Sequence, residues 1–142
     1  MKSISISLFF IILLLSCSVE PEKISYGQEA CHFCKMTIVD RQHAAQIVTT
    51  KGKAYKYDAA ECMINDMKQK SDTEIKFHLV NDYTNPSVLI DATNASYIIS
   101  AAIQSPMGAN LSAFKNVEDA NKILAESGGE LYNWKEIVTK LN

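Results

Sequence analysis

The apolar segment at the N-terminus most restricts what this chain can fold into, because it separates the first residues from the part that forms a domain. Residues 4–15 are apolar except for two serines. A stretch of this length is too short to span a bilayer comfortably and matches a signal-peptide core. The sequence therefore predicts a signal peptide over residues 1–16. That leaves residues 17–142 to fold as one domain or as two very small ones.

A cysteine follows the apolar segment directly. The run that ends at Cys17 resembles a bacterial lipobox, in which the peptidase cuts before a cysteine that carries a lipid. We expect Cys17 to be lipidated; the alternative is a plain signal peptide with an incidental cysteine. Residues 17–29 are mostly polar and predict a flexible tether between lipid and domain. The chain is thus expected in the cell envelope, anchored to the outer or inner membrane and facing the periplasm, and Ser18 favours the outer membrane.

Charge and cysteine content narrow the function further. The formal net charge is −2 and no cluster of lysines or arginines stands out, which argues against a nucleic-acid partner. Beyond Cys17 the cysteines are Cys31, Cys34 and Cys62. An odd number in an oxidising compartment leaves at least one thiol unpaired or bound to something. A bound metal ion would explain it.

The pattern of polar and apolar residues predicts an α+β fold. Residues 44–50 have the composition of a strand and residues 53–58 alternate between polar and apolar, which together indicate a hairpin. A helix capped by Asp58 follows to residue 70. A preceding strand is expected over residues 36–40. Further elements are expected as strands over residues 77–81, 87–91, 95–100 and 110–114, a helix from Asn116 to Gly128-Gly129, and a short final helix. The halves are similar, which predicts two small units over residues 30–82 and 83–142, with a boundary in a loop over residues 81–86.

The densest chemistry lies in Cys31-His32-Phe33-Cys34-Lys35-Met36. Thiolate and thioether sulfurs are soft donors that select Cu(I) over hard cations. Other interpretations stay open. Cys31 and Cys34 could form a disulfide or a redox pair, although a redox pair of the thioredoxin type opens a helix and a strand is expected here. Met36 could pack in the core.

Other residues have simpler interpretations. Cys62 fits a buried position of the predicted helix, and Asp58 fits its cap. No paired carboxylates and no Ser-His-Asp pattern stand out in the sequence, which argues against a hydrolase. A single Cys-x-x-Cys without a second pair excludes a structural zinc site of four cysteines. From the residues alone, metal binding is favoured only slightly over a disulfide.

The chain resembles the NosL family, copper chaperones associated with nitrous oxide reductase. The features that carry the resemblance are the lipobox ending at Cys17, the Cys31–Met36 motif followed by Thr37-Ile38, Tyr57-Asp58 before a helix with Cys62-Met63, the Pro106-Met107-Gly108 turn, and Ala113-Phe114 before a helix that ends at Gly128-Gly129. The resemblance implies units of strand-strand-helix-strand type, like those of organomercurial lyases. It also implies a protein that binds Cu(I) and is not an enzyme.

The resemblance further implies a site and partners. Its ligand candidates are Cys34, Met36 and Met107, with Cys31 and His32 as secondary ones. Met107 lies in the second half, so the two halves would have to close on one ion. The copper would pass to a copper-accepting enzyme, expected to be nitrous oxide reductase, with an ABC-type transporter complex as a further partner. Family members often have glycine where this chain has Lys35. The alternatives are an envelope thiol–disulfide oxidoreductase using Cys31 and Cys34, and a structural lipoprotein adaptor.

Overall fold

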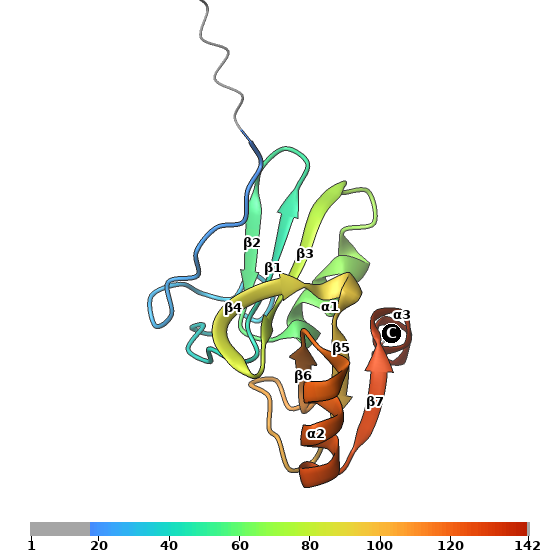
Figure 1. Cartoon of the computed structure of the whole chain (residues 1–142). Helices are drawn as coiled ribbons and strands as arrows, with labels where there is room; N and C mark the ends of the chain where they lie inside the picture. The colour runs from blue at the N-terminus through green and yellow to red at the C-terminus, as the bar shows by residue number, and fades with distance from the viewer. Residues whose placement is uncertain (1–17, 142) are drawn as a thin grey trace, which may run out of the picture.

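The computed structural model describes residues 18–141 (Figure 1). The predicted signal peptide and the predicted lipidation site at Cys17 lie outside these residues. No helix among residues 18–141 is long and apolar enough to cross a membrane. The elements are β1 (Ala45–Thr49), β2 (Ala54–Tyr57), α1 (Ala60–Gln69), β3 (Ile75–Asp82), β4 (Asn85–Asp91), the 3-10 helix η1 (Ala92–Asn94), β5 (Ser96–Ile99), β6 (Leu111–Phe114), α2 (Val117–Ser127), β7 (Glu130–Asn133) and α3 (Trp134–Lys140).

Two antiparallel sheets share one connectivity, which confirms an α+β fold of two similar units. The first sheet has the order β2-β1-β3-β4 and the second has the order β6-β5-β7. In each sheet the first strand lies between the second and the third, and a helix connects the second to the third. The repeated pattern is strand-strand-helix-strand, with β4 added at the edge of the first sheet.

The segment between the units is more regular than the sequence indicates. The loop expected over residues 81–86 is a hairpin, because β3 pairs with β4 across the two residues Tyr83 and Thr84. Pro86 lies in β4, an edge strand, where the missing N–H costs no ladder hydrogen bond on the solvent side. The hairpin crosses the proposed division between residues 82 and 83, so that division stays a prediction.

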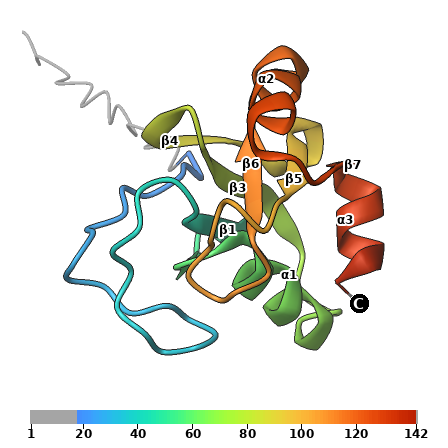
Figure 2. The same ribbon diagram turned by 90° about the horizontal axis from the view of Figure 1, so that it is seen from below.

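One hydrophobic core serves both sheets. Its buried members include Ile47 and Tyr57 from the first sheet, Met63 from α1, and Tyr97 and Leu111 from the second sheet. Figures 1 and 2 show α1 lying between the two sheets, with α2 and α3 on the second unit. The two units pack against each other through α1 and through a direct contact of β3 with β6.

Part of the predicted tether belongs to the domain. The backbone of Glu22 exchanges two hydrogen bonds with the side chain of Gln46 on β1, at 2.8 and 2.7 Å. Ile24 is 3% exposed and joins the core. Residues from about Glu22 onward thus pack against the first sheet, because Gln46 is a buried amide whose donor and acceptor need partners.

Two local predictions were wrong. The strand expected over residues 36–40 is absent from the described residues except for one bridge between Ala30 and Thr37. Asp58 does not cap α1: the N-cap is Ala59, and no side chain makes the capping hydrogen bond. Asp58 instead joins the group of thiols described below, and Met36 lines a cavity beside that group.

The end of α2 follows the sequence prediction. The helix has Asn116 as its N-cap and Gly128 as its C-cap, and Gly128 and Gly129 have positive φ values of 65° and 116°. A Cβ at Gly129 would collide with the backbone of Ile99 on β5. Glycine is therefore required for the chain to pass from α2 into β7.

Candidate metal centre

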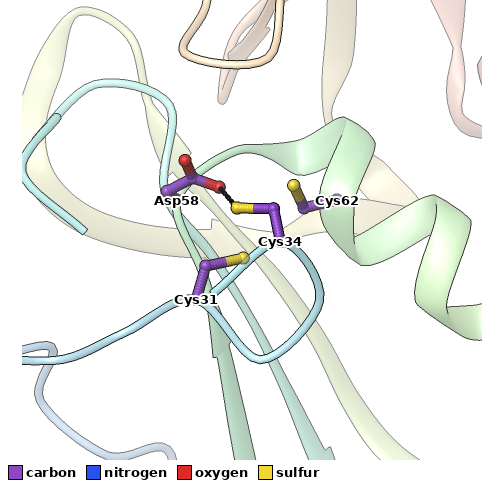
Figure 3. A group of neighbouring side chains, drawn as sticks. All are labelled: Cys31, Cys34, Asp58 and Cys62. Carbon is purple, nitrogen blue, oxygen red and sulfur yellow. Dashed lines mark hydrogen bonds between the residues drawn. The ribbon is translucent and has the colours of Figure 1, made fainter. Parts of the chain in front are cut away.

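Three cysteines and one carboxylate converge at the start of α1 (Figure 3). The Sγ atoms of Cys31, Cys34 and Cys62 and a carboxylate oxygen of Asp58 all lie within 4.8 Å of one another. Cys31 and Cys34 come from a turn before β1, Asp58 follows β2, and Cys62 is in the first turn of α1. All three cysteines are free thiols. The group has the size and the donors of a metal site.

The turn that presents Cys31 and Cys34 is closed by its own backbone. The N–H of Cys31 donates to the carbonyl oxygen of Met36 at 2.7 Å, and the N–H of Lys35 donates to that of Cys31 at 3.0 Å. Lys35 has a φ of 67°, in the left-handed region that favours glycine. This conformation explains why glycine suits the position.

Hydrogen bonds and burial give the three thiols different acidities. Cys62 as a hydrogen-bond donor lowers the pKa of Cys31, although burial acts against this shift. The same contact, followed by burial, raises the pKa of Cys62. Burial raises the pKa of Cys34, whose Sγ donates to Oδ1 of Asp58 at 3.4 Å. The contact between Cys31 and Cys62 therefore favours a thiolate on Cys31, beside the N-terminal end of α1, where a helix favours negative charge.

His32 lies in the turn but is not a member of this group. Its ring packs against Tyr55 with 4.5 Å between centroids, and its Nε2 is 3.3 Å from Nζ of Lys70 and 3.9 Å from Oδ2 of Asp66. The pKa of His32 lies below its usual value, mainly because the ring is partly buried. The imidazole is thus occupied by contacts on the β2 and α1 side.

The two candidate methionines lie at the surface. Met36 is 55% exposed and Met107 is 40% exposed, so the interpretation of Met36 as a core residue was wrong. A cavity of about 360 Å³ is lined by Met36, Asp58, Ser105 and Pro106, among others. The cavity therefore joins the first motif to the residue before Met107. Asp58 borders both the cavity and the thiols.

The sequence interpretation missed Asp58 and Cys62 as members of the site. Cys62 is 1% exposed, as expected of a buried helical residue, yet its thiol faces Cys31. The odd number of cysteines was the signal that could have found it, since a third thiol had no other partner. Asp58 carried no comparable signal, because an aspartate before a helix is most often a cap.

Tertiary structure also assembles a Ser-His-Asp arrangement that the sequence does not reveal. Nδ1 of His43 lies 2.9 Å from Oδ2 of Asp40, and Nε2 lies 3.1 Å from Oγ of Ser112 on β6. Ser112 and His43 are only 1% and 5% exposed. A substrate carbonyl could not reach a serine that deeply buried, so we assign these contacts a structural role that links the segment before β1 to β6.

Comparison with known proteins agrees with this fold and donor set. Residues 23–141 match the NosL family. A copper-binding lipoprotein NosL from Stutzerimonas stutzeri is 27% identical over 128 residues, which cover 84% of this chain and 67% of that protein. The crystal structure of the copper chaperone NosL from Shewanella denitrificans superposes with a TM-score of 0.66 at 21% identity, covering 82% of this chain and 96% of that one. The prediction of a protein that is not an enzyme agrees with both names. This chain belongs to the NosL family.

Proposed function

We propose that this protein binds Cu(I) at the group formed by Cys31, Cys34 and Cys62 and delivers it to a copper enzyme outside the cytoplasm. The observation that carries the proposal is the convergence of three free thiols within 4.8 Å. Three sulfur donors suit Cu(I), which accepts two or three soft ligands. The names of the two relatives, a copper-binding lipoprotein and a copper chaperone, support the choice of metal.

The proposed division of labour follows from burial. Cys31 and Cys62 are each 1% exposed and would hold the ion, whereas Met36 and Met107 are exposed and would act at the surface. A thioether is a weaker donor than a thiolate, so an ion on Met36 or Met107 could be released more easily. Cys34 is half-buried, so its exposure lies between that of the two buried cysteines and that of the two methionines. Copper would enter and leave through the cavity beside Asp58.

The finer parts of the proposal concern place and partners. Lipidation at Cys17 would hold the protein at a membrane of the cell envelope, facing the periplasm. The recipient would be nitrous oxide reductase, with an ABC-type transporter complex as a further partner. The resemblance to the NosL family and the name of the lipoprotein relative support these assignments.

A Cu(I) titration tests the proposal. Full-length protein in detergent would be titrated with Cu(I) against a competing chelator, as wild type, as Cys62→Ser and as Met67→Leu. We expect wild type to bind one Cu(I), and Cys62→Ser to bind roughly 100-fold more weakly, equivalent to about 3 kcal/mol. Met67 lies on the same helix as Cys62, so Met67→Leu is the matched control, and its Cu(I) affinity should equal that of wild type. Wild type that cannot compete with the chelator would contradict the proposal.

An oxidoreductase is the main alternative, and the same protein samples would test it. An envelope thiol–disulfide oxidoreductase requires Cys31 and Cys34 to cycle between dithiol and disulfide, which does not require Cys62. Cys62→Ser should then leave dithiol oxidation unchanged. The third thiol within reach of Cys31 makes the copper proposal the better supported one.

A further inference from the structure

The turn that carries Met107 is linked to α1 through the side chain of Glu61, which the hydroxyl of Ser105 and the backbone of Ala109 both contact. The hydroxyl of Ser105 donates to Oε1 of Glu61, and the same oxygen of Ser105 accepts the N–H of Asn110 at 2.9 Å. The carbonyl of Ser105 accepts the N–H of Gly108 at 3.1 Å. Ser105 therefore closes the turn internally and, through its hydroxyl hydrogen, ties it to the first unit. Figure 2 shows this loop, in orange, beside α1.

Burying the carboxylate of Glu61 costs free energy of folding. Glu61 directly precedes Cys62 in the first turn of α1 and is 3% exposed. Its second carboxylate oxygen, Oε2, has no hydrogen-bond partner within residues 18–141. A buried polar atom without a partner costs free energy of folding, so stability alone does not account for a carboxylate at this position. What Glu61 does achieve is a link from the helix of Cys62 to the loop of Met107.

The link also fixes one wall of the cavity beside the cysteines. Ser105 and Pro106 line that cavity together with Met36, and Asp58 lies both on its wall and beside the thiol of Cys34. Met107 is the next residue, 40% exposed, with a side chain long and flexible enough to turn toward the cavity. Replacing the Glu61 carboxylate would remove the hydrogen bonds that the loop between β5 and β6 makes to this side chain of α1.

We propose that Glu61 is a positioning residue, which holds Ser105 so that the thioether of Met107 can reach a Cu(I) ion bound by the cysteines. This inference rests on the proposed function. Glu61 does not coordinate the ion in this scheme. Its contribution to copper affinity therefore passes entirely through Met107, and this dependence can be measured.

The test is a double-mutant cycle on copper affinity in full-length protein. Glu61→Leu, Glu61→Gln and Ser105→Ala would each be made alone and together with Met107→Leu, and titrated with Cu(I) against a chelator. We expect Glu61→Leu and Ser105→Ala to weaken binding about tenfold in the presence of Met107, and less than about twofold once Met107 is replaced. Glu61→Gln keeps an oxygen that accepts from Ser105, so its affinity should stay near that of wild type.

The matched control is Ser100→Ala. Ser100 begins the same loop, is 1% exposed and donates to the carbonyl oxygen of Ser127 at 3.0 Å, and within residues 18–141 it makes no hydrogen bond to α1. If Ser100→Ala weakens copper binding as much as Ser105→Ala, or if the losses are equal with and without Met107, a positioning role for Glu61 is excluded.

Amide hydrogen exchange of the copper-free protein separates this inference from the proposed function. Glu61→Leu should speed exchange at Gly108 and Asn110, whose N–H groups donate to Ser105. Unchanged exchange would overturn the positioning role even if copper binds. Wild type that takes up no Cu(I) would instead overturn the proposed function, and the copper role of Glu61 with it.

Discussion

Asp58 and Cys62 lie four residues apart, one just after β2 and the other inside α1, and both point toward the Cys31–Cys34 turn (Figure 3). Their roles depend on the N-cap being Ala59, because a capping Asp58 would direct its carboxylate to the helix amides. Asp58 is instead free to accept from the thiol of Cys34. At the scale of single residues, one shifted cap position thus supplies the site with its carboxylate.

His32 provides a prediction at this scale, because its imidazole already contacts Tyr55, Asp66 and Lys70. We expect His32→Ala to change Cu(I) affinity less than about threefold, a free-energy difference below 1 kcal/mol. Cys31→Ser should lower the affinity far more. The chelator titration compares both variants, and a loss in His32→Ala equal to that of Cys31→Ser would make His32 a ligand.

The ends of β4 repeat one turn. Asp82 accepts from the hydroxyl and the N–H of Thr84 and from the side-chain amide of Asn85, and Asp91 accepts the same three bonds from Thr93 and Asn94. The two sequences, Asp-Tyr-Thr-Asn and Asp-Ala-Thr-Asn, share their first, third and fourth residues. Such local bonds fix where a strand starts and ends, and here they define the edge strand of the first sheet.

These turns predict how stability depends on pH. Burial by itself raises the pKa of Asp82, but the hydrogen bonds from Asn85 and Thr84 more than offset it, so the pKa lies below its usual range. A lowered folded-state pKa means that the stabilisation is present above the unfolded pKa, near 3.9, and is lost as the pH falls through the folded value. The free energy of unfolding should therefore decrease as the pH falls below about 5.

Asp82→Asn tests this dependence by urea denaturation at several pH values. The variant should lose about 1 kcal/mol at pH 7 and show a smaller decrease toward acid pH than wild type. Asp91→Asn alters the same set of bonds at an exposed position, where water can replace them, and should have a weaker effect. An unchanged acid dependence in Asp82→Asn would contradict the assignment.

At the scale of the whole molecule, several contacts join the two units across the shared core. Trp134 on α3 packs against His78 on β3 and Tyr97 on β5, with ring centroids 5.8 and 6.0 Å apart. His43 reaches Ser112 on β6. Since buried residues of both sheets form one cluster, neither unit has a separate core of comparable size.

The shared core predicts a single cooperative unfolding transition. Trp134 is the only tryptophan, so its fluorescence reports the junction of the units, while far-ultraviolet circular dichroism reports both of them. The two signals should give the same midpoint in urea. Ser112→Ala removes a buried partner of His43 and should lower both midpoints together, by about 1–2 kcal/mol in free energy of unfolding. A fluorescence midpoint at lower urea concentration than the circular-dichroism midpoint would mean that the two units separate before they unfold.

Short-range patterns determined most of the elements and their order, although the strand expected over residues 36–40 did not form. The hairpin of β1 and β2, the helices α1 and α2, and the stop at Gly128 all follow from alternation, helical spacing and glycine within a few residues. The α+β class and the dense sulfur motif were visible for the same reason. The hairpin of β3 and β4 was not visible in the sequence, because Pro86 usually indicates a turn. A proline fits within a strand only at the edge of a sheet, and the sequence does not show that β4 is an edge strand.

Tertiary structure alone decided which side chains meet. Cys31 and Cys62 are brought together by the packing of α1 on the first sheet, and Ser105 meets Glu61 across 44 positions of the chain. Met36 follows a residue with positive φ and lies exposed, which composition did not indicate. Sequence pattern reports periodicity over neighbouring residues, whereas a metal centre depends on side-chain directions set by backbone angles and by packing between distant segments.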